Sequence, residues 1–171
     1  RHAAVIPYPD RQSDGLAGQT RGPRINGVLS IIRGCQDVMG TFIFSGVFDR
    51  FPGLKVVCVE ADAGWVLHYM DRMDHAYKRH RYWMKAAPLA RLPSEYFRDN
   101  IYVTFQDDWV AFGMKEMCNV RQLMWANDFP HSDSTWPLSQ TMLGEHTKDL
   151  REQDGNWICH ENVAELYGIA F

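Results

Sequence analysis

One stretch decides the fold of this chain, and it reads Trp125-Ala126-Asn127-Asp128-Phe129-Pro130-His131-Ser132-Asp133-Ser134-Thr135-Trp136-Pro137. The apolar run 123–126 leads into it and predicts a buried strand. Asp128 and His131 follow that strand at once. In architectures that alternate strands and helices, the carboxyl ends of the strands supply the functional residues. We therefore expect Asp128 to belong to a site.

The composition is that of a globular protein. The 171 residues are 46% hydrophobic and 13% aromatic, which is enough to bury a sizeable core, and we expect a single domain over residues 1–171. Eighteen basic and 21 acidic residues give a net charge of −3 without a basic stripe, so no nucleic-acid partner is expected. The sequence has no apolar run of ~20 residues, and its first residues lack the apolar core that a signal peptide requires. We expect a cytoplasmic protein with no membrane partner.

The four cysteines are widely spaced and never form a Cys-x-x-Cys pair, which argues against a zinc knuckle or a thioredoxin-like motif. Cys58 lies within an apolar strand and Cys35 on the apolar stripe of a probable helix. Both are ordinary core positions for a small hydrophobic residue. We expect reduced, mostly buried thiols.

Strands and helices alternate along the chain. Strands are predicted at residues 1–6, 54–60, 101–105 and 123–126, and helices at 28–43, 65–77, 110–117 (capped by Asp107), 138–150 and 157–167. The second strand is apolar at almost every position, as in a parallel strand that is covered on both faces. A complete (β/α)₈ barrel needs ~250 residues. The chain is therefore expected to be an α/β protein that forms about half of a TIM barrel, with parallel strands and outer helices.

Polar residues stand at each of the four strand ends. They are His2 at the first, Glu60 at the second, residues 106–108 at the third, and Asp128 with His131 at the fourth. All of them would face one rim. Imidazole and carboxylate groups together suit a divalent transition metal such as Zn²⁺, Mn²⁺ or Fe²⁺. Such a metal polarises a substrate carbonyl or activates a bound water.

Simpler interpretations stand beside these. Asp128 could be an acidic residue of an ordinary turn, and His131 could form a hydrogen bond with the local backbone. Composition alone gives little support for His2 as a metal ligand. Glu60 ends an apolar strand, where an unpaired charge is costly, and this favours a site role. The remaining histidines fall on predicted helices and are excluded from the site: His68, His75, His80, His146 and His160.

Three segments carry a family resemblance over residues 27–169. They are Ser45-Gly46-Val47-Phe48-Asp49-Arg50-Phe51-Pro52-Gly53-Leu54-Lys55-Val56-Val57, Asn127-Asp128-Phe129-Pro130-His131-Ser132-Asp133 and Glu161-Asn162-Val163-Ala164-Glu165-Leu166-Tyr167-Gly168. Together they resemble the amidohydrolase-related family of metal-dependent TIM-barrel hydrolases and decarboxylases.

The resemblance implies that this chain is the C-terminal half of the barrel. Asp128 then matches the metal-binding aspartate of the last strand, and His2 the histidine of the fifth. Glu60 stands where many decarboxylases of the family have a histidine. The His-x-His pair of the first strand is absent from the sequence, so the metal would lack ligands. The chain is expected to need a missing N-terminal half or to form a homo-oligomer.

We accordingly expect a metal-dependent hydrolase that acts on a small carboxylated or cyclic compound. His2 and Asp128 would bind the metal, with zinc expected first and manganese or iron as alternatives, while Glu60 and His131 would orient substrate or water or move protons. Two alternatives stay open. One is a non-oxidative decarboxylase of the same family, and the other is a non-catalytic half-barrel that acts only as an interaction module.

Overall fold

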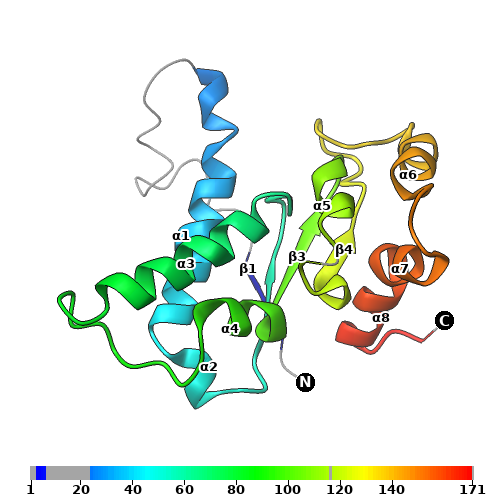
Figure 1. Cartoon of the computed structure of the whole chain (residues 1–171). Coiled ribbons are helices and arrows are strands. Elements are labelled where there is room, and N and C mark those ends of the chain that lie inside the picture. Colours follow the sequence, from blue (N-terminus) through cyan, green and yellow to red (C-terminus); the bar gives the residue numbers. More distant parts are fainter. Residues whose placement is uncertain (1–2, 7–23, 116, 171) are drawn as a thin grey trace.

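The computed structural model describes residues 3–6, 24–115 and 117–170 (Figure 1). Its centre is a parallel sheet whose strand order follows the chain: β1 (Ala3–Ile6), β2 (Lys55–Cys58), β3 (Ile101–Phe105) and β4 (Leu123–Trp125). Neighbouring strands pair in parallel, for example Val56 with Ile101 and Val103 with Leu123. The predicted succession of parallel strands is confirmed, although β2 is shorter than the predicted 54–60.

Helices connect and follow these strands. Between β1 and β2 lie η2 (Arg24–Gly27), α1 (Ser30–Phe44) and α2 (Val47–Arg50). Between β2 and β3 lie α3 (Val66–His80) and α4 (Pro93–Asn100), and between β3 and β4 lie α5 (Trp109–Gly113) and η3 (Val120–Gln122). After β4 come α6 (Ser139–Thr147), α7 (Glu152–Asn156), the π-helical turn η4 (Trp157–Glu161) and α8 (Asn162–Tyr167). The last predicted helix, 157–167, is thus the π-helical turn η4 followed by α8, and α7 precedes it.

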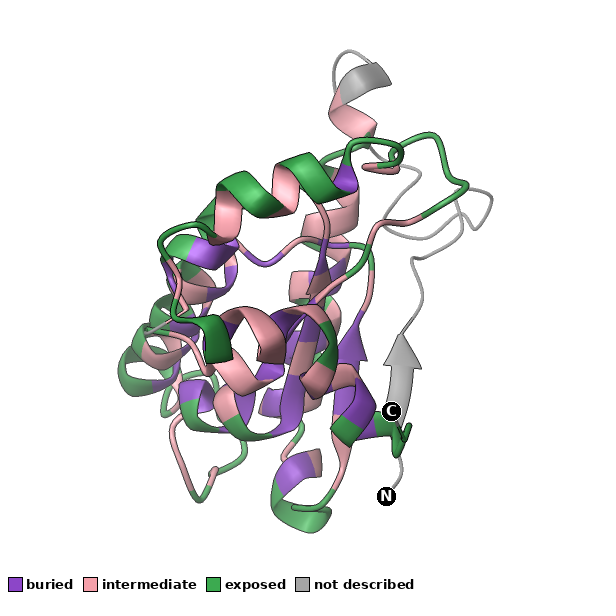
Figure 2. Ribbon diagram, turned by 90° about the vertical axis from the view of Figure 1, so that its right-hand side faces the viewer, coloured by how far each residue is buried: buried purple, intermediate pink, exposed green. Residues whose placement is uncertain are grey.

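The main core lies between one face of the sheet and the helices that cover it (Figure 2). Strand residues of alternate positions, such as Val56, Cys58 and Val103, face it and are at most 2% exposed. Met39 of α1 and Met70 of α3 pack against them. This arrangement follows from the strand period of two, which sends every second side chain to the same face.

The other face of the sheet carries a smaller apolar cluster. Val57, Tyr102 and Met124 lie there with Val163 and Leu166 of α8.

Thr104 is in register with Met124 and shares this second face, two residues after Tyr102 in β3.

Two buried asparagines fix the amino ends of strands. The Asn100 side chain donates from Nδ2 to the carbonyls of Pro52 and Leu54, at 3.0 and 2.8 Å. Asn162, at the start of α8, donates from Nδ2 to the carbonyls of Val120 and Leu123, both at 2.8 Å. These bonds satisfy backbone groups that the parallel ladder leaves unpaired.

Further features concern the cysteines, the end of α8 and the length of the helices. Cys35 and Cys58 are 1% and 0% exposed, as expected, and all four cysteines are free thiols. Gly168 ends α8 with a left-handed φ of 69°, the conformation of a glycine C-cap. Within the described ranges, no helix has both the length and the apolar character that crossing a membrane requires.

Candidate functional site

The polar residues predicted at the strand ends lie at the carboxyl edge of the sheet. Glu60 comes shortly after β2, Gln106 follows β3 directly, and Asp128 comes shortly after β4. Because the strands are parallel, their carboxyl ends share one edge, and these residues line it. His2, the fourth predicted site residue, lies outside the described residues.

Asp128 and His131 form a pair beyond β4. Nδ1 of His131 lies 2.9 Å from Oδ2 of Asp128, and the two side chains are 65% and 20% exposed. The backbone N–H of His131 also donates to the Asp128 carbonyl, at 2.8 Å. Asp128 has a φ of 58°, in the left-handed region that few non-glycine residues adopt. The turn therefore brings together two residues that the sequence predicted, and His131 bonds the Asp128 carbonyl through its backbone and contacts the Asp128 carboxylate through its ring.

The loop around this pair is held by Asn127. Its Oδ1 accepts the N–H of Phe129 at 3.2 Å, and its carbonyl accepts the Ser134 hydroxyl at 2.7 Å and the Thr135 N–H at 3.2 Å. These three bonds close the loop on itself. Asp128 is consequently presented by an ordered turn.

The close contact between Nδ1 of His131 and Oδ2 of Asp128 distinguishes the two nitrogens of the imidazole. Neutral imidazole carries its proton on one nitrogen, and a carboxylate partner places that proton on Nδ1. Nε2 of His131 has no hydrogen-bond partner among the described residues. The pair thus offers a carboxylate that can bind a cation and an imidazole nitrogen, Nε2, that can accept a proton and, once protonated, deliver it.

Glu60 lies at the same edge but stands apart from this pair. Its side chain is exposed, its φ is 59°, and its backbone N–H donates to Oγ1 of Thr104 at 3.1 Å. In the part of the chain that the structure describes, no hydrogen bond or ion pair joins the Glu60 carboxylate to another group. Glu60 lies two residues beyond the end of β2 instead of ending the strand, and its catalytic role stays a prediction.

Asp108 organises the turn that follows Glu60. Its Oδ2 accepts the N–H groups of Ala63 and Gly64, at 2.8 and 2.6 Å, and its Oδ1 accepts the N–H of Ala111 at 3.2 Å. Asp108 is therefore the N-cap of α5, and the predicted cap, Asp107, was wrong by one residue. The sequence could not distinguish these neighbours, because the two additional bonds come from residues more than 40 positions earlier.

Asp62, which the sequence analysis did not select, lies within this turn. Burial is the main cause that raises the pKa of its carboxyl group, and the negative charge of Asp108 raises it further. A backbone hydrogen bond from Gln106 acts in the opposite direction. Like Asp128, Asp62 has a left-handed φ, here 51°. A carboxyl group soon after a strand was the sequence signal that could have identified it.

His146 also reaches this edge, although the sequence analysis excluded it as a helical residue. Its Nε2 lies 3.9 Å from Oδ1 of Asp107, and its ring lies 5.6 Å from that of Phe112. Nδ1 of His146 is buried without a hydrogen-bond partner in the described structure. The contact arises because α6 folds back over α5, which residue spacing does not reveal.

The predicted metal site lies only partly within the described residues. Across residues 3–6, 24–115 and 117–170, no three His, Cys, Asp or Glu side chains gather in the manner of a metal site. Asp128 is the one predicted metal ligand within these ranges. Oε1 of Gln106 is buried at the same edge without a protein partner.

An aromatic pair flanks Asp128. The rings of Phe129 and Trp136 meet edge to face, with centroids 5.8 Å apart and planes at 72°, and each residue is 61% exposed. An apolar surface therefore stands beside the polar turn. Such a combination suits a ligand with a flat apolar body and a polar head.

The comparisons with known proteins agree on one family. The model of the amidohydrolase family matches residues 33–169. The decarboxylase orsB of Emericella nidulans is 25% identical over 128 residues, which cover 73% of this chain and 38% of that protein. This chain thus spans well under half the length of that curated relative.

Solved structures share the fold. The 5-carboxyvanillate decarboxylase of Sphingomonas paucimobilis matches with a TM-score of 0.76 and 24% identity, over 98% of this chain and 50% of that chain. A dihydroxybenzoic acid decarboxylase from Polaromonas sp. JS666, solved with manganese and 2-nitroresorcinol, matches with a TM-score of 0.63 and 20% identity, over 86% of this chain and 42% of that chain. The predicted half of a TIM barrel is confirmed.

Proposed function

Because this chain belongs to the amidohydrolase family, we propose that it forms the C-terminal half of the catalytic barrel of a metal-dependent decarboxylase acting on a small aromatic carboxylate. The Asp128–His131 pair carries the proposal, since it offers a cation-binding oxygen and a proton-carrying nitrogen in one turn. The relatives named above support decarboxylation. Hydrolysis, which the sequence analysis placed first, stays a prediction.

A divalent cation fits the chemistry of Asp128. Its carboxylate is partly buried at the carboxyl edge and uses Oδ2 for His131, which leaves Oδ1 for an ion. The ligand role of His2 stays a prediction. When bound, the cation would hold the oxygens of the substrate and withdraw electron density from it. We favour Mn²⁺ over the zinc expected from sequence, because carboxylate is a hard oxygen donor and the Polaromonas enzyme binds manganese.

The proton chemistry falls to His131 and Glu60. In decarboxylation the bond between the ring carbon and the carboxylate breaks, its electron pair stays on the ring carbon, and that carbon then takes a proton. With Nδ1 held by Asp128, a protonated His131 can deliver this proton from Nε2. Glu60, exposed two residues beyond β2, would orient the substrate or exchange protons with solvent.

The aromatic preference rests on Phe129 and Trp136. Their exposed edge-to-face pair provides an apolar wall next to Asp128, against which a planar ring can stack. A carboxylated aromatic compound would place its ring on this wall and its charge toward the polar turn.

Product analysis tests the proposal. The full polypeptide that the gene encodes is loaded with Mn²⁺ and incubated with 2,6-dihydroxybenzoate or 5-carboxyvanillate, and CO₂ and the ring product are quantified. We expect equal molar amounts of both. Asp128→Asn should lower bound metal and abolish turnover, whereas Asp149→Asn, which changes an exposed acid after α6, should change neither. Full metal occupancy in Asp128→Asn, or hydrolysis products without CO₂, would contradict the proposal.

A further inference from the structure

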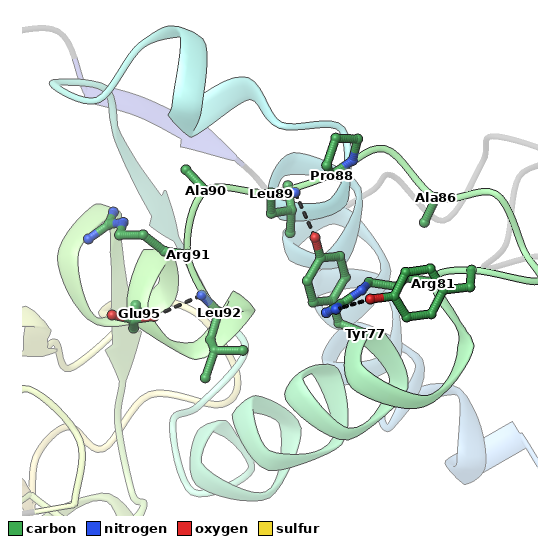
Figure 3. A pocket seen from close by; sticks show the side chains of 10 residues that line it. Tyr77, Arg81, Ala86, Pro88, Leu89, Ala90, Arg91, Leu92 and Glu95 are labelled. Atoms are coloured by element: carbon green, nitrogen blue, oxygen red, sulfur yellow. Dashed lines mark hydrogen bonds between the residues drawn. The ribbon is translucent and has the colours of Figure 1, made fainter.

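A hollow lies far from the candidate site. It is bounded by the end of α3, the loop 81–92 and the start of α4 (Figure 3). Its volume is about 610 Å³, within the range of small-molecule sites. Tyr77, Arg81, Leu89 and Glu95 are among the residues that line it. We propose that this Arg81 hollow binds a small organic anion with a flat apolar body, independently of the function proposed above.

The charge of the surrounding segment favours an anion. Residues 76–94 contain five Lys and Arg residues and no Asp or Glu, in a chain whose net charge is −3. A concentration of like charge around a concave surface attracts ligands of the opposite sign. Of the charged lining residues, Arg91 pairs with Asp99, and Glu95 accepts a backbone N–H at the start of α4. Arg81 is the cation that these contacts leave uncompensated.

Arg81 is held in place without a carboxylate. Its guanidinium lies 5.0 Å from the ring centroid of Tyr77 and 4.5 Å from that of Tyr82, and it donates to the Tyr82 hydroxyl at 2.6 Å. A guanidinium has five N–H donors. Among the described residues, no carboxylate forms an ion pair with Arg81, and Tyr82 is its one hydrogen-bond acceptor. A positioned guanidinium with free donors binds a carboxylate or phosphate at low entropic cost.

The loop 81–92 forms the other wall of the hollow, and side chains of α3 and α2 hold it in place. The Tyr77 hydroxyl points from α3 toward the loop and accepts the Leu89 N–H at 2.6 Å (Figure 3). The next N–H, that of Ala90, donates to Asp49 of α2 at 3.3 Å. These bonds fix the position of the loop relative to α3 and α2. The apolar side chains of the loop, with the Tyr77 ring, can then receive the body of a ligand.

The hollow is separate from the carboxyl edge of the sheet. Helix α3 begins shortly after Glu60 and ends at His80, next to Arg81. Its 15 residues correspond to a length of roughly 22 Å. Figure 1 shows the loop after α3 at the opposite side of the molecule from α6 and α7. Occupation of one site therefore does not require the other.

Benzoate is a suitable probe because it combines a flat ring with one carboxylate. Its binding is measured by calorimetry on the full polypeptide carrying Asp128→Ala, which removes the contribution of the candidate catalytic site. We expect one site that Arg81→Met weakens at least about tenfold, since charge-assisted hydrogen bonds are lost. Benzyl alcohol, which has the ring without the charge, should not bind measurably.

Arg79→Met is the matched control, because it removes the same charge from an exposed position two residues away. It should change benzoate affinity less than twofold. Equal weakening by Arg79→Met and Arg81→Met would indicate a diffuse electrostatic attraction and overturn the proposal. Undiminished binding in Arg81→Met, or the absence of benzoate binding before that substitution, would do the same.

Discussion

Asp108→Ala should destabilise the fold by about 3–4 kcal/mol. Loss of the N-cap bond to Ala111 costs about 1 kcal/mol. The N–H groups of Ala63 and Gly64 lose their shared acceptor as well, and Ala63 is fully buried. Each unsatisfied buried donor costs about 1–3 kcal/mol. Asp108→Asn keeps one acceptor oxygen, so it should cost about half as much.

Urea unfolding, followed by circular dichroism, measures this effect as a lower midpoint with an unchanged slope. Asp107→Ala is the adjacent control. Its side chain is 72% exposed and its contact with His146 spans 3.9 Å, so its loss should cost less than about 1 kcal/mol. Equal stabilities of the Asp108→Ala and Asp107→Ala proteins would refute the argument that Asp108 holds the turn.

A double-mutant cycle sharpens the same test. A Cβ at Gly64 would lie 2.9 Å from Oδ1 of Asp108, too close without a shift of that side chain. Gly64→Ala should therefore destabilise the parent protein by about 1–3 kcal/mol. In the Asp108→Ala background its cost should decrease, because the obstructing oxygen is gone. Strict additivity of the two substitutions would show that they do not act on each other.

Three further predictions concern stability and reactivity. Burial and the charge of Asp108 raise the pKa of Asp62 in the folded protein. The free energy of unfolding therefore decreases as the pH rises above 3.8 and this carboxyl group ionises. Asp62→Asn should increase stability at pH 7 and reduce this pH dependence in urea titrations. Asn162→Ala removes two buried hydrogen bonds to Val120 and Leu123 and should cost about 2–3 kcal/mol by thermal or urea unfolding, whereas an unchanged midpoint would contradict this anchor. Burial raises the pKa of Cys118 to about 11, so its reaction with Ellman's reagent at pH 8 should be at least tenfold slower in the folded than in the denatured protein, with Cys118→Ser identifying the thiol.

The spacing of apolar residues predicted the helices and strands because it follows directly from which side chains are buried. The apolar run at Val56 and Val57 and the alternation from Ile101 to Phe105 correspond to strands, since the buried faces of a sheet require such side chains. The same logic placed Glu60 and Asp128 at strand ends, because a charge seldom interrupts a buried strand. Boundaries were less accurate. Glu60 itself lies beyond β2, in the turn with left-handed backbone that Asp108 holds.

Contacts between segments that are far apart in the sequence leave no pattern in the local sequence. The pairing of Asp108 with Ala63 and Gly64 joins β3 to the turn after β2, and it depends on the distance between neighbouring strands. The Arg81 hollow likewise arises because α2, α3 and α4 converge on one loop. Sequence spacing within a single helix or strand cannot predict either arrangement.

By itself, the sequence determined that this protein alternates buried strands with helices and sets Asp128 and His131 behind the last strand, because hydrophobic periodicity and turn chemistry are local properties. The tertiary structure decided that His131 Nδ1 meets the Asp128 carboxylate, that Asp108 supports the turn after Glu60, and that Arg81 faces a hollow. Hydrogen bonds and ion pairs depend on distances of a few ångströms between groups. Only the packing of the elements in three dimensions sets those distances.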